Sequence, residues 1–206
     1  MEPSLRAPAL RRALGLEYLS LAWNVLETLV GFAAGLASGS VALMGFALDS
    51  VVESSSAAAL IWRLRKERDG HAPAEEIEQR AVRIVGAAFF ALAVYVGGQA
   101  IYDLVTRSAP EASALGIGLA TVSVIVMPWL AARKRRLAST LDSRSLQADS
   151  DQTWLCTYIS AFLLVGLGAN AAFGWWWADP AAALVIAGFA AKEGRELWTT
   201  QRFCNC

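Results

Sequence analysis

The chain has 206 residues, of which 56% are hydrophobic and eight are Trp. This proportion is too high for an ordinary soluble domain and indicates a membrane protein. The 18 Lys and Arg residues balance the 18 Asp and Glu residues, so the net charge of zero says nothing about partners.

Six segments are long and apolar enough to cross a bilayer, which takes about 20 helical residues each. They cover residues 15–38, 41–62, 81–105, 112–132, 146–174 and 180–197. We therefore predict an all-α membrane protein with one transmembrane domain over residues 15–197, an arm at 1–14 and a tail at 198–206. The longest connection, residues 63–80, leaves no room for a soluble domain, so we expect a protein that is not an enzyme.

The cationic residues alternate between the connections. All Lys and Arg except Arg107 fall in the arm, in or beside the second-to-third and fourth-to-fifth connections, or in the last residues of the sixth span and the tail. By the positive-inside rule, this pattern places both termini in the cytoplasm, and the protein in an inner or plasma membrane. The basic run "RKRR" at 133–136 is one of these orientation signals and is expected to face anionic lipid. Since no binding domain accompanies the basic residues, we expect no nucleic-acid partner.

The first span carries Asn24 and Glu27 one turn apart, with Glu27 deep in the apolar segment. Ionisable residues at bilayer depth are functional by default, so we predict that these two support a site or carry protons. Simple pairing with another helix is the alternative. Farther along, Gly31, Gly35 and Gly39 recur at every fourth position, a spacing that lets two helices approach closely.

The second span carries Asp49 and Glu53 within "GFALDSVVESS". At positions i and i+4 the two acids share one helical face, and the span holds no Lys or Arg to neutralise them. A carboxylate at bilayer depth costs about 2.5–3.5 kcal/mol, and a bound divalent cation removes the repulsion between two of them. We predict that they form half of a metal site. The alternative is a protonated pair that only hydrogen-bonds to other helices.

The fifth span, "SLQADSDQTWLCTYIS", places Asp149, Gln152 and Cys156 on one helical face. Counted at about 1.5 Å per residue from the outer ends of the two spans, Gln152 and Cys156 overlap in depth with Asp49 and Glu53. Those four side chains are predicted to frame a pocket near the midplane. Asp149 is predicted as a proton relay or as part of the cytoplasmic mouth, with a role as a metal ligand as the alternative. For Gln152 and Cys156 the alternative is packing.

Three Trp residues at 175–177 suit the membrane interface, and Asp179 is expected to cap the sixth helix with Pro180 at its first position. The tail ends in "CNC". Cys204 and Cys206 are possible metal ligands, but they supply only two of the four ligands that a structural zinc site needs. We expect either a site shared between two tails, a hand-over of ions to the pore, or an end without a metal.

The chain also shows a weak internal similarity. "SVALMGFALDSVVE" aligns without gaps on "SRSLQADSDQTWLC", with Ser40 on Ser143 and Leu43 on Leu146. Three spans separate the two starts, so the copies run in opposite directions through the membrane. Inverted repeats with a midplane site at their junction are typical of transporters.

These motifs resemble the cation diffusion facilitators. The second span of that family typically reads S-x-x-L…D-S-x-x-D, the fifth reads A-D-x-x-H-x-x-x-D, and an Asp follows near the start of the sixth. The matching text here is "SVALMGFALDSVVE", "LQADSDQTWLC" and "WWWADPAAALVIA". The resemblance implies export of divalent cations in exchange for protons by a homodimer. It also implies metal ligands at Asp49, Glu53, Gln152 and Cys156.

Three of these positions depart from the family pattern, with Glu53 in place of Asp, Gln152 in place of His and Cys156 in place of Asp. Gln cannot titrate, and a thiolate favours zinc or cadmium over magnesium or calcium. The cytoplasmic metal-binding domain of the family is also missing after the sixth span, so we expect a short branch of the family.

We therefore predict a six-helix transporter that moves a zinc-like cation out of the cytoplasm by proton antiport, with no prosthetic group. A non-transporting metal-binding subunit or sensor in the membrane is the alternative from another class, and a transporter of a different small solute is a third. The expected partners are the metal ion, protons, the lipid bilayer and a second copy of the chain.

Overall fold

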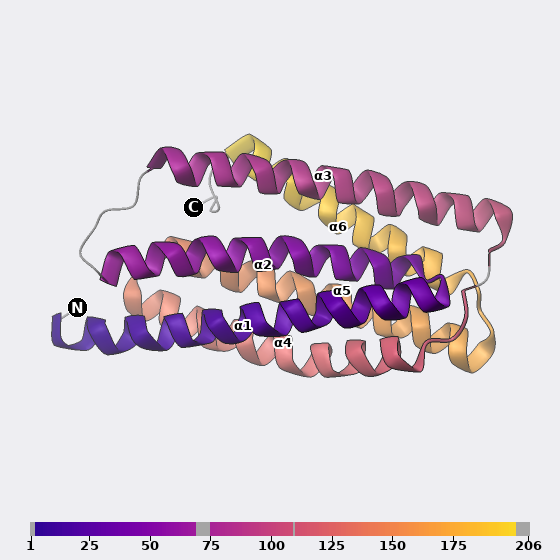
Figure 1. Cartoon of the computed structure of the whole chain (residues 1–206), viewed down its shortest axis with the longest axis horizontal. Coiled ribbons are helices and arrows are strands. Elements are labelled where there is room, and N and C mark those ends of the chain that lie inside the picture. Colours follow the sequence, from indigo (N-terminus) through magenta and orange to yellow (C-terminus); the bar gives the residue numbers. More distant parts are fainter. Residues whose placement is uncertain (1–2, 69–74, 109, 201–206) are drawn as a thin grey trace.

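The computed structural model of the chain describes residues 3–68, 75–108 and 110–200, and these fold into a bundle of helices (Figure 1). The helices are α1 (Pro3–Ser38), α2 (Val41–Arg68), α3 (Glu75–Thr106), α4 (Ala114–Leu141), α5 (Arg144–Phe173) and α6 (Ala178–Thr200). The predicted all-α class is confirmed, and each predicted segment overlaps one of the six helices.

The helices pack as a group of four with a pair alongside. Helices α1, α2, α4 and α5 contact one another, while α3 and α6 lie together and reach the group through α2 and α5. Figure 1 shows α3 and α6 along one side, with α1 and α4 on the opposite side. The start of α1 and the end of α6 lie at the same end of the bundle.

Five of the described helices, α1 to α5, contain a stretch that is long and apolar enough to cross a membrane. Helix α6 is shorter than the other five and carries the charged run "KEGRE" near its end. The coarse prediction of a multi-pass membrane protein therefore has direct support from five helices.

The helices continue beyond the predicted spans. Helix α1 is helical from Pro3, so the segment expected as an arm is part of this helix. Helix α4 runs to Leu141, so the basic run 133–136 is helical, and only residues 142–143 separate α4 from α5. The physical reason is that Lys and Arg are good helix formers, and no Gly or Pro interrupts the helix between residue 129 and Leu141.

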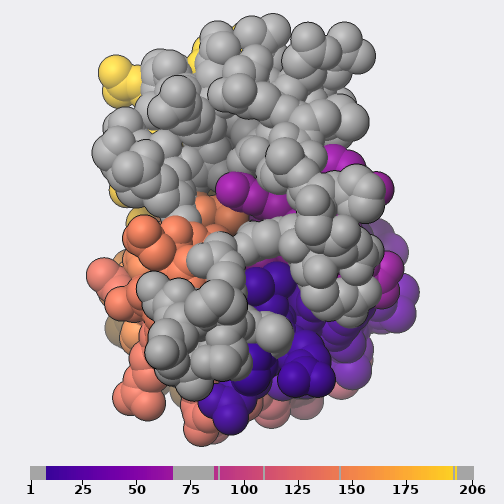
Figure 2. Space-filling model, turned by 90° about the vertical axis from the view of Figure 1, so that its left-hand side faces the viewer, coloured from indigo at the N-terminus to yellow at the C-terminus, as the bar shows by residue number. Residues whose placement is uncertain are grey.

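The buried apolar residues form two clusters. The larger cluster draws on all six helices. The smaller one joins the first turns of α1 to the end of α2, the end of α4 and the start of α5. Figure 2, which faces this end of the bundle, shows the start of α1 in indigo beside α4 and α5 in salmon and orange.

Close packing of α1 on α2, predicted from the glycine spacing, is confirmed at two of the three positions. A Cβ atom at Gly31 would lie 3.0 Å from the Cβ of Ala47, and one at Gly35 would lie 3.0 Å from the sulfur of Met44. Gly39 has a different role, since its φ of +69° allows the turn between α1 and α2.

Asp179 does not cap its own helix as predicted. Helix α6 begins at Ala178, one residue earlier, and the Asp179 side chain turns toward α2. Its carboxylate accepts a hydrogen bond from the Ser40 hydroxyl, and it accepts the backbone N–H groups of Val41 and Ala42 at 3.1 and 3.3 Å. Because the first N–H groups of a helix have no partner within the helix, the buried carboxylate satisfies the start of α2 and joins it to α6.

We predict that Asp179→Ala lowers the free energy of unfolding by about 2 kcal/mol, because it removes three hydrogen bonds to a buried carboxylate. Thermal unfolding of the detergent-solubilised protein measures the loss. Asp151→Ala is the matched control, since the Asp151 side chain is 58% exposed and its ion pair with Arg135 spans 3.7 Å. Equal unfolding temperatures for the two variants would show that the contact between α6 and α2 adds no stability.

Candidate metal centre

Helix α1 carries a stripe of polar side chains on the face that packs into the bundle. Glu17, Ser20, Asn24 and Glu27 follow one another at intervals of three or four residues, which places them on one helical face. All four are buried. Because hydrocarbon offers no hydrogen-bond partner, polar groups on such a stripe depend on partners from neighbouring helices.

Glu27 is fully engaged by three donors. The Trp23 indole N–H donates to Oε1 at 2.7 Å, and the Ser123 hydroxyl of α4 donates to the same oxygen. The Ser50 hydroxyl of α2 donates to Oε2 at 3.1 Å. Glu27 thus joins α1, α2 and α4 and contacts the residue next to Asp49, while its role as a proton carrier stays a prediction.

The two acids of α2 are buried side by side. Asp49 is 6% exposed and Glu53 is 2% exposed. The Thr153 hydroxyl of α5 donates to Glu53 Oε1 at 3.1 Å, and Cys156, about one turn farther along α5, is buried as well. The structure therefore brings the predicted faces of α2 and α5 together.

Of the four predicted ligands, Asp49, Glu53 and Cys156 are buried. Gln152 lies one turn from Cys156 and is only half-buried. The α5 side chain that contacts Glu53 from this turn belongs to Thr153. Metal binding by these residues stays a prediction.

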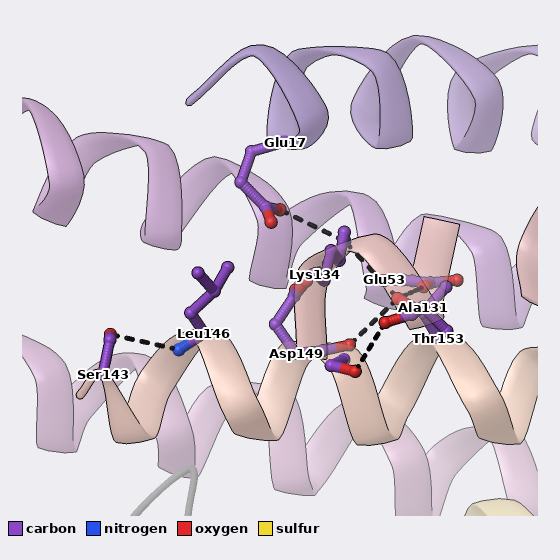
Figure 3. Close-up of polar contacts among 9 residues, drawn as sticks. Glu17, Glu53, Ala131, Lys134, Ser143, Leu146, Asp149 and Thr153 are labelled. Carbon is purple, nitrogen blue, oxygen red and sulfur yellow. Dashed lines mark hydrogen bonds and ion pairs between the residues drawn. The ribbon is translucent and has the colours of Figure 1, made fainter. Parts of the chain in front are cut away.

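Asp149 takes part in a buried ion pair that was not predicted. The Lys134 ammonium of α4 bonds to Asp149 Oδ2, lies 3.2 Å from Glu17 Oε2, and donates to the Thr153 hydroxyl at 3.4 Å. The Lys134 side chain has no exposed surface. Figure 3 shows Lys134 between Glu17 and Asp149, with Thr153 and Glu53 beside this ion pair. Asp149 is therefore an interior residue and does not line an exposed mouth.

Lys134 and Glu17 were not predicted as site residues, for different reasons. Lys134 was grouped with its basic neighbours, yet it continues a buried stripe of α4 whose members lie at intervals of three or four residues: Met127, Ala131, Lys134, Ala138 and Leu141. The three Arg residues around it are exposed. Glu17 is in register with Asn24 and Glu27, at intervals of seven and three residues, and that register is the signal that was available.

The remaining predicted residues have different outcomes. The side chain of Asn24 is buried, and neither its amide nitrogen nor its oxygen has a partner within the described residues. Cys204 and Cys206 lie outside the described residues. Among the described residues, no three His, Cys, Asp or Glu side chains converge at distances that would hold a metal ion as they stand.

Comparison with known proteins gives a consistent result. A family model described as the cation efflux transmembrane domain matches residues 18–200. Transmembrane protein 163 of Xenopus laevis is 30% identical over 139 residues, which are 68% of this chain and 49% of that protein. An uncharacterized transporter of Synechocystis sp. is 30% identical over 170 residues, 79% of this chain and 52% of that protein.

The cation-efflux pump FieF of Shewanella oneidensis is 26% identical over 174 residues, which are 80% of this chain and 57% of that protein. The chain thus spans about half the length of the curated relatives that it matches.

The contact between α5 and Glu53 leads to a prediction for Thr153→Val. The substitution keeps the shape of the side chain but leaves a buried carboxylate oxygen without its donor, so we expect a loss of about 1–3 kcal/mol in the free energy of unfolding. Thermal unfolding in detergent is the measurement. Thr157→Val is the control, because the Thr157 hydroxyl donates only to the backbone of its own helix. If both variants lose the same stability, the bond to Glu53 contributes nothing of its own.

Proposed function

This chain belongs to the cation efflux family, and from that premise we propose that it is a membrane transporter that moves a divalent cation out of the cytoplasm in exchange for protons. Zinc is the ion we expect. The observation that carries the proposal is a pair of buried carboxyl groups on α2, Asp49 and Glu53, beside α5, which contacts Glu53 through Thr153 and buries Cys156.

The proposed ligands are Asp49, Glu53, Gln152 and Cys156. Two carboxylates, an amide oxygen and a thiolate form a mixed donor set that suits zinc or cadmium better than magnesium or calcium. Thr153 fixes the Glu53 carboxyl group through its hydrogen bond. Such support from neighbouring polar groups orients metal ligands and tunes their affinity.

Proton exchange follows from the chemistry of these ligands. A carboxylate or thiolate must be deprotonated to bind a metal, so cation binding releases protons and cation release allows them to return. If the site opens to alternate sides of the membrane, this competition couples cation movement to proton movement in the opposite direction. Apparent cation affinity should accordingly fall as the pH falls.

The rest of the proposed assembly draws on the charge pattern and on the family. We place α6 across the membrane as a sixth span, with both termini in the cytoplasm, because the cationic residues gather at the same end as the start of α1. An inverted arrangement of α1–α3 and α4–α6, a homodimeric state and a location in the inner or plasma membrane complete the proposal.

Cation flux in proteoliposomes tests this function. With zinc outside and an acidic lumen, protons leave as cations enter, so we expect uptake well above that at equal pH. Asp49→Ala and Glu53→Ala should each lower the uptake by about tenfold or more, because each removes a charged ligand, and each should abolish zinc binding in calorimetry. Asp151→Ala, an exposed acid of α5, should retain both activities.

The outcomes separate the candidate functions. Zinc binding without gradient-driven uptake would identify a metal-binding subunit or sensor, and uptake that ignores the pH gradient would identify a facilitator. Unchanged zinc affinity in both the Asp49→Ala and the Glu53→Ala proteins would contradict the site itself.

Selectivity provides a separate prediction for Cys156→Asp. The change replaces a soft sulfur ligand by a hard oxygen ligand, so we expect cadmium to lose affinity relative to manganese. Competition calorimetry with the two ions measures the shift. The same preference before and after the substitution would show that Cys156 contributes packing alone.

A further inference from the structure

Lys134 differs from every other buried charge in the described part of the protein. Among residues with described side chains, seven buried Asp and Glu residues accompany this single buried cation. A buried charge requires compensation, and two of the seven acids, Glu17 and Asp149, provide it here. The ammonium group is therefore a fixed positive charge within a strongly acidic interior.

The ammonium lies in a polar layer formed by Glu17, Glu53, Lys134, Asp149 and Thr153. Along α2, α4 and α5, these residues fall between members of the larger apolar cluster and members of the smaller one. The layer is continuous with the candidate metal centre, because Thr153 contacts both Lys134 and Glu53. Figure 3 shows these side chains pointing toward one another from α1, α2, α4 and α5.

Lys134 does not satisfy all the oxygen atoms around it. Glu17 Oε1, Asp149 Oδ1 and Glu53 Oε2 are buried and have no hydrogen-bond partner within the described residues. Together with the Thr153 hydroxyl, they are hard oxygen donors from three helices around the ammonium, and with the ammonium in place the three acids do not converge at metal-ligand distances. Such donors suit a divalent cation that prefers oxygen ligands, such as manganese.

We propose that the Lys134 ammonium occupies a second cation-binding position, formed by Glu17, Asp149, Glu53 and Thr153, and that a divalent cation on its way to or from the metal centre displaces it. The movement of the cation to or from the metal centre rests on the proposed transport function, but the binding position itself is independent of transport. The Lys134 side chain acts as a tethered counter-charge that keeps the position closed to divalent ions while it is in place.

The chemistry of lysine favours a displaceable counter-charge over a permanent structural ion pair. Its charge sits at the end of a flexible four-carbon chain and is strongly hydrated, so it can exchange carboxylate partners for water. A guanidinium group with its rigid fork of donors would hold the same carboxylates more firmly. The rival interpretation is an ion pair that only joins α1, α4 and α5, and the two interpretations differ in what happens when the ammonium is removed.

Lys134→Met in the full-length, detergent-purified protein tests the inference, with manganese ion as the probe. The neutral side chain leaves the carboxylates uncompensated, so the variant should bind one more manganese ion per chain than the unmodified protein in equilibrium dialysis. Adding Asp149→Asn to Lys134→Met should remove that extra ion. Arg135→Gln is the matched control: it also removes one positive charge, but from an exposed neighbouring side chain, and should leave the ion count unchanged.

A folded Lys134→Met protein with the manganese count of the unmodified chain overturns the proposal and leaves a structural ion pair. If Lys134→Met does not fold alone, folding in manganese-supplemented medium decides: recovery by the cation supports the second position, and failure with and without manganese overturns it. The uptake of zinc by the unmodified protein tests the transport function separately. Either proposal can therefore fail while the other stands.

Discussion

Charged groups inside a bundle of membrane-length helices have no bulk water to solvate them, so each must be compensated by side chains from neighbouring helices. In this protein the compensation also determines which helices are neighbours. Glu27 takes donors from α1, α2 and α4, and Lys134 joins α1, α4 and α5. Asp179 of α6 accepts the first N–H groups of α2. Polar contacts of this kind add specificity where apolar packing alone gives little driving force.

The small residues of α1 make the central contacts possible. Gly31 and Ala47 approach so closely that an added Cβ atom would lie 3.0 Å away. Glu27 is one turn before Gly31, and its partner Ser50 is about one turn after Ala47. The close approach therefore brings α2 within hydrogen-bond distance of Glu27. The backbone packing and the polar centre depend on the same pair of helices.

The two identical positions in the internal similarity between residues 40–53 and 143–156 have a structural explanation. Ser40 accepts the N–H of Leu43 at 3.1 Å at the start of α2, and Ser143 accepts the N–H of Leu146 at 3.4 Å at the start of α5. Both are helix caps. Because the two helices run in opposite directions from matching caps, residues at equal distances from those caps meet near the middle of the bundle. Glu53 and Cys156 are such a pair in position, each 13 residues after its cap, and the contact to Glu53 comes from Thr153, one turn before Cys156.

The sequence alone determined the six helices, the burial of Asp49 and Glu53 and the shared face that carries Cys156, because helix length, apolar content and residue spacing are local properties of the chain. The tertiary structure alone decided where two other charged side chains point, those of Lys134 and Asp179. Lys134 points inward, away from the basic residues beside it, because α4 continues past the predicted end of its span and turns that position toward Glu17 and Asp149. Asp179 caps α2 because the turn before α6 brings it beside the first N–H groups of another helix. Both outcomes depend on which helix lies opposite and on its rotation; the spacing along α4 can place Lys134 on a buried face, but the partners of both charges come from distant parts of the chain.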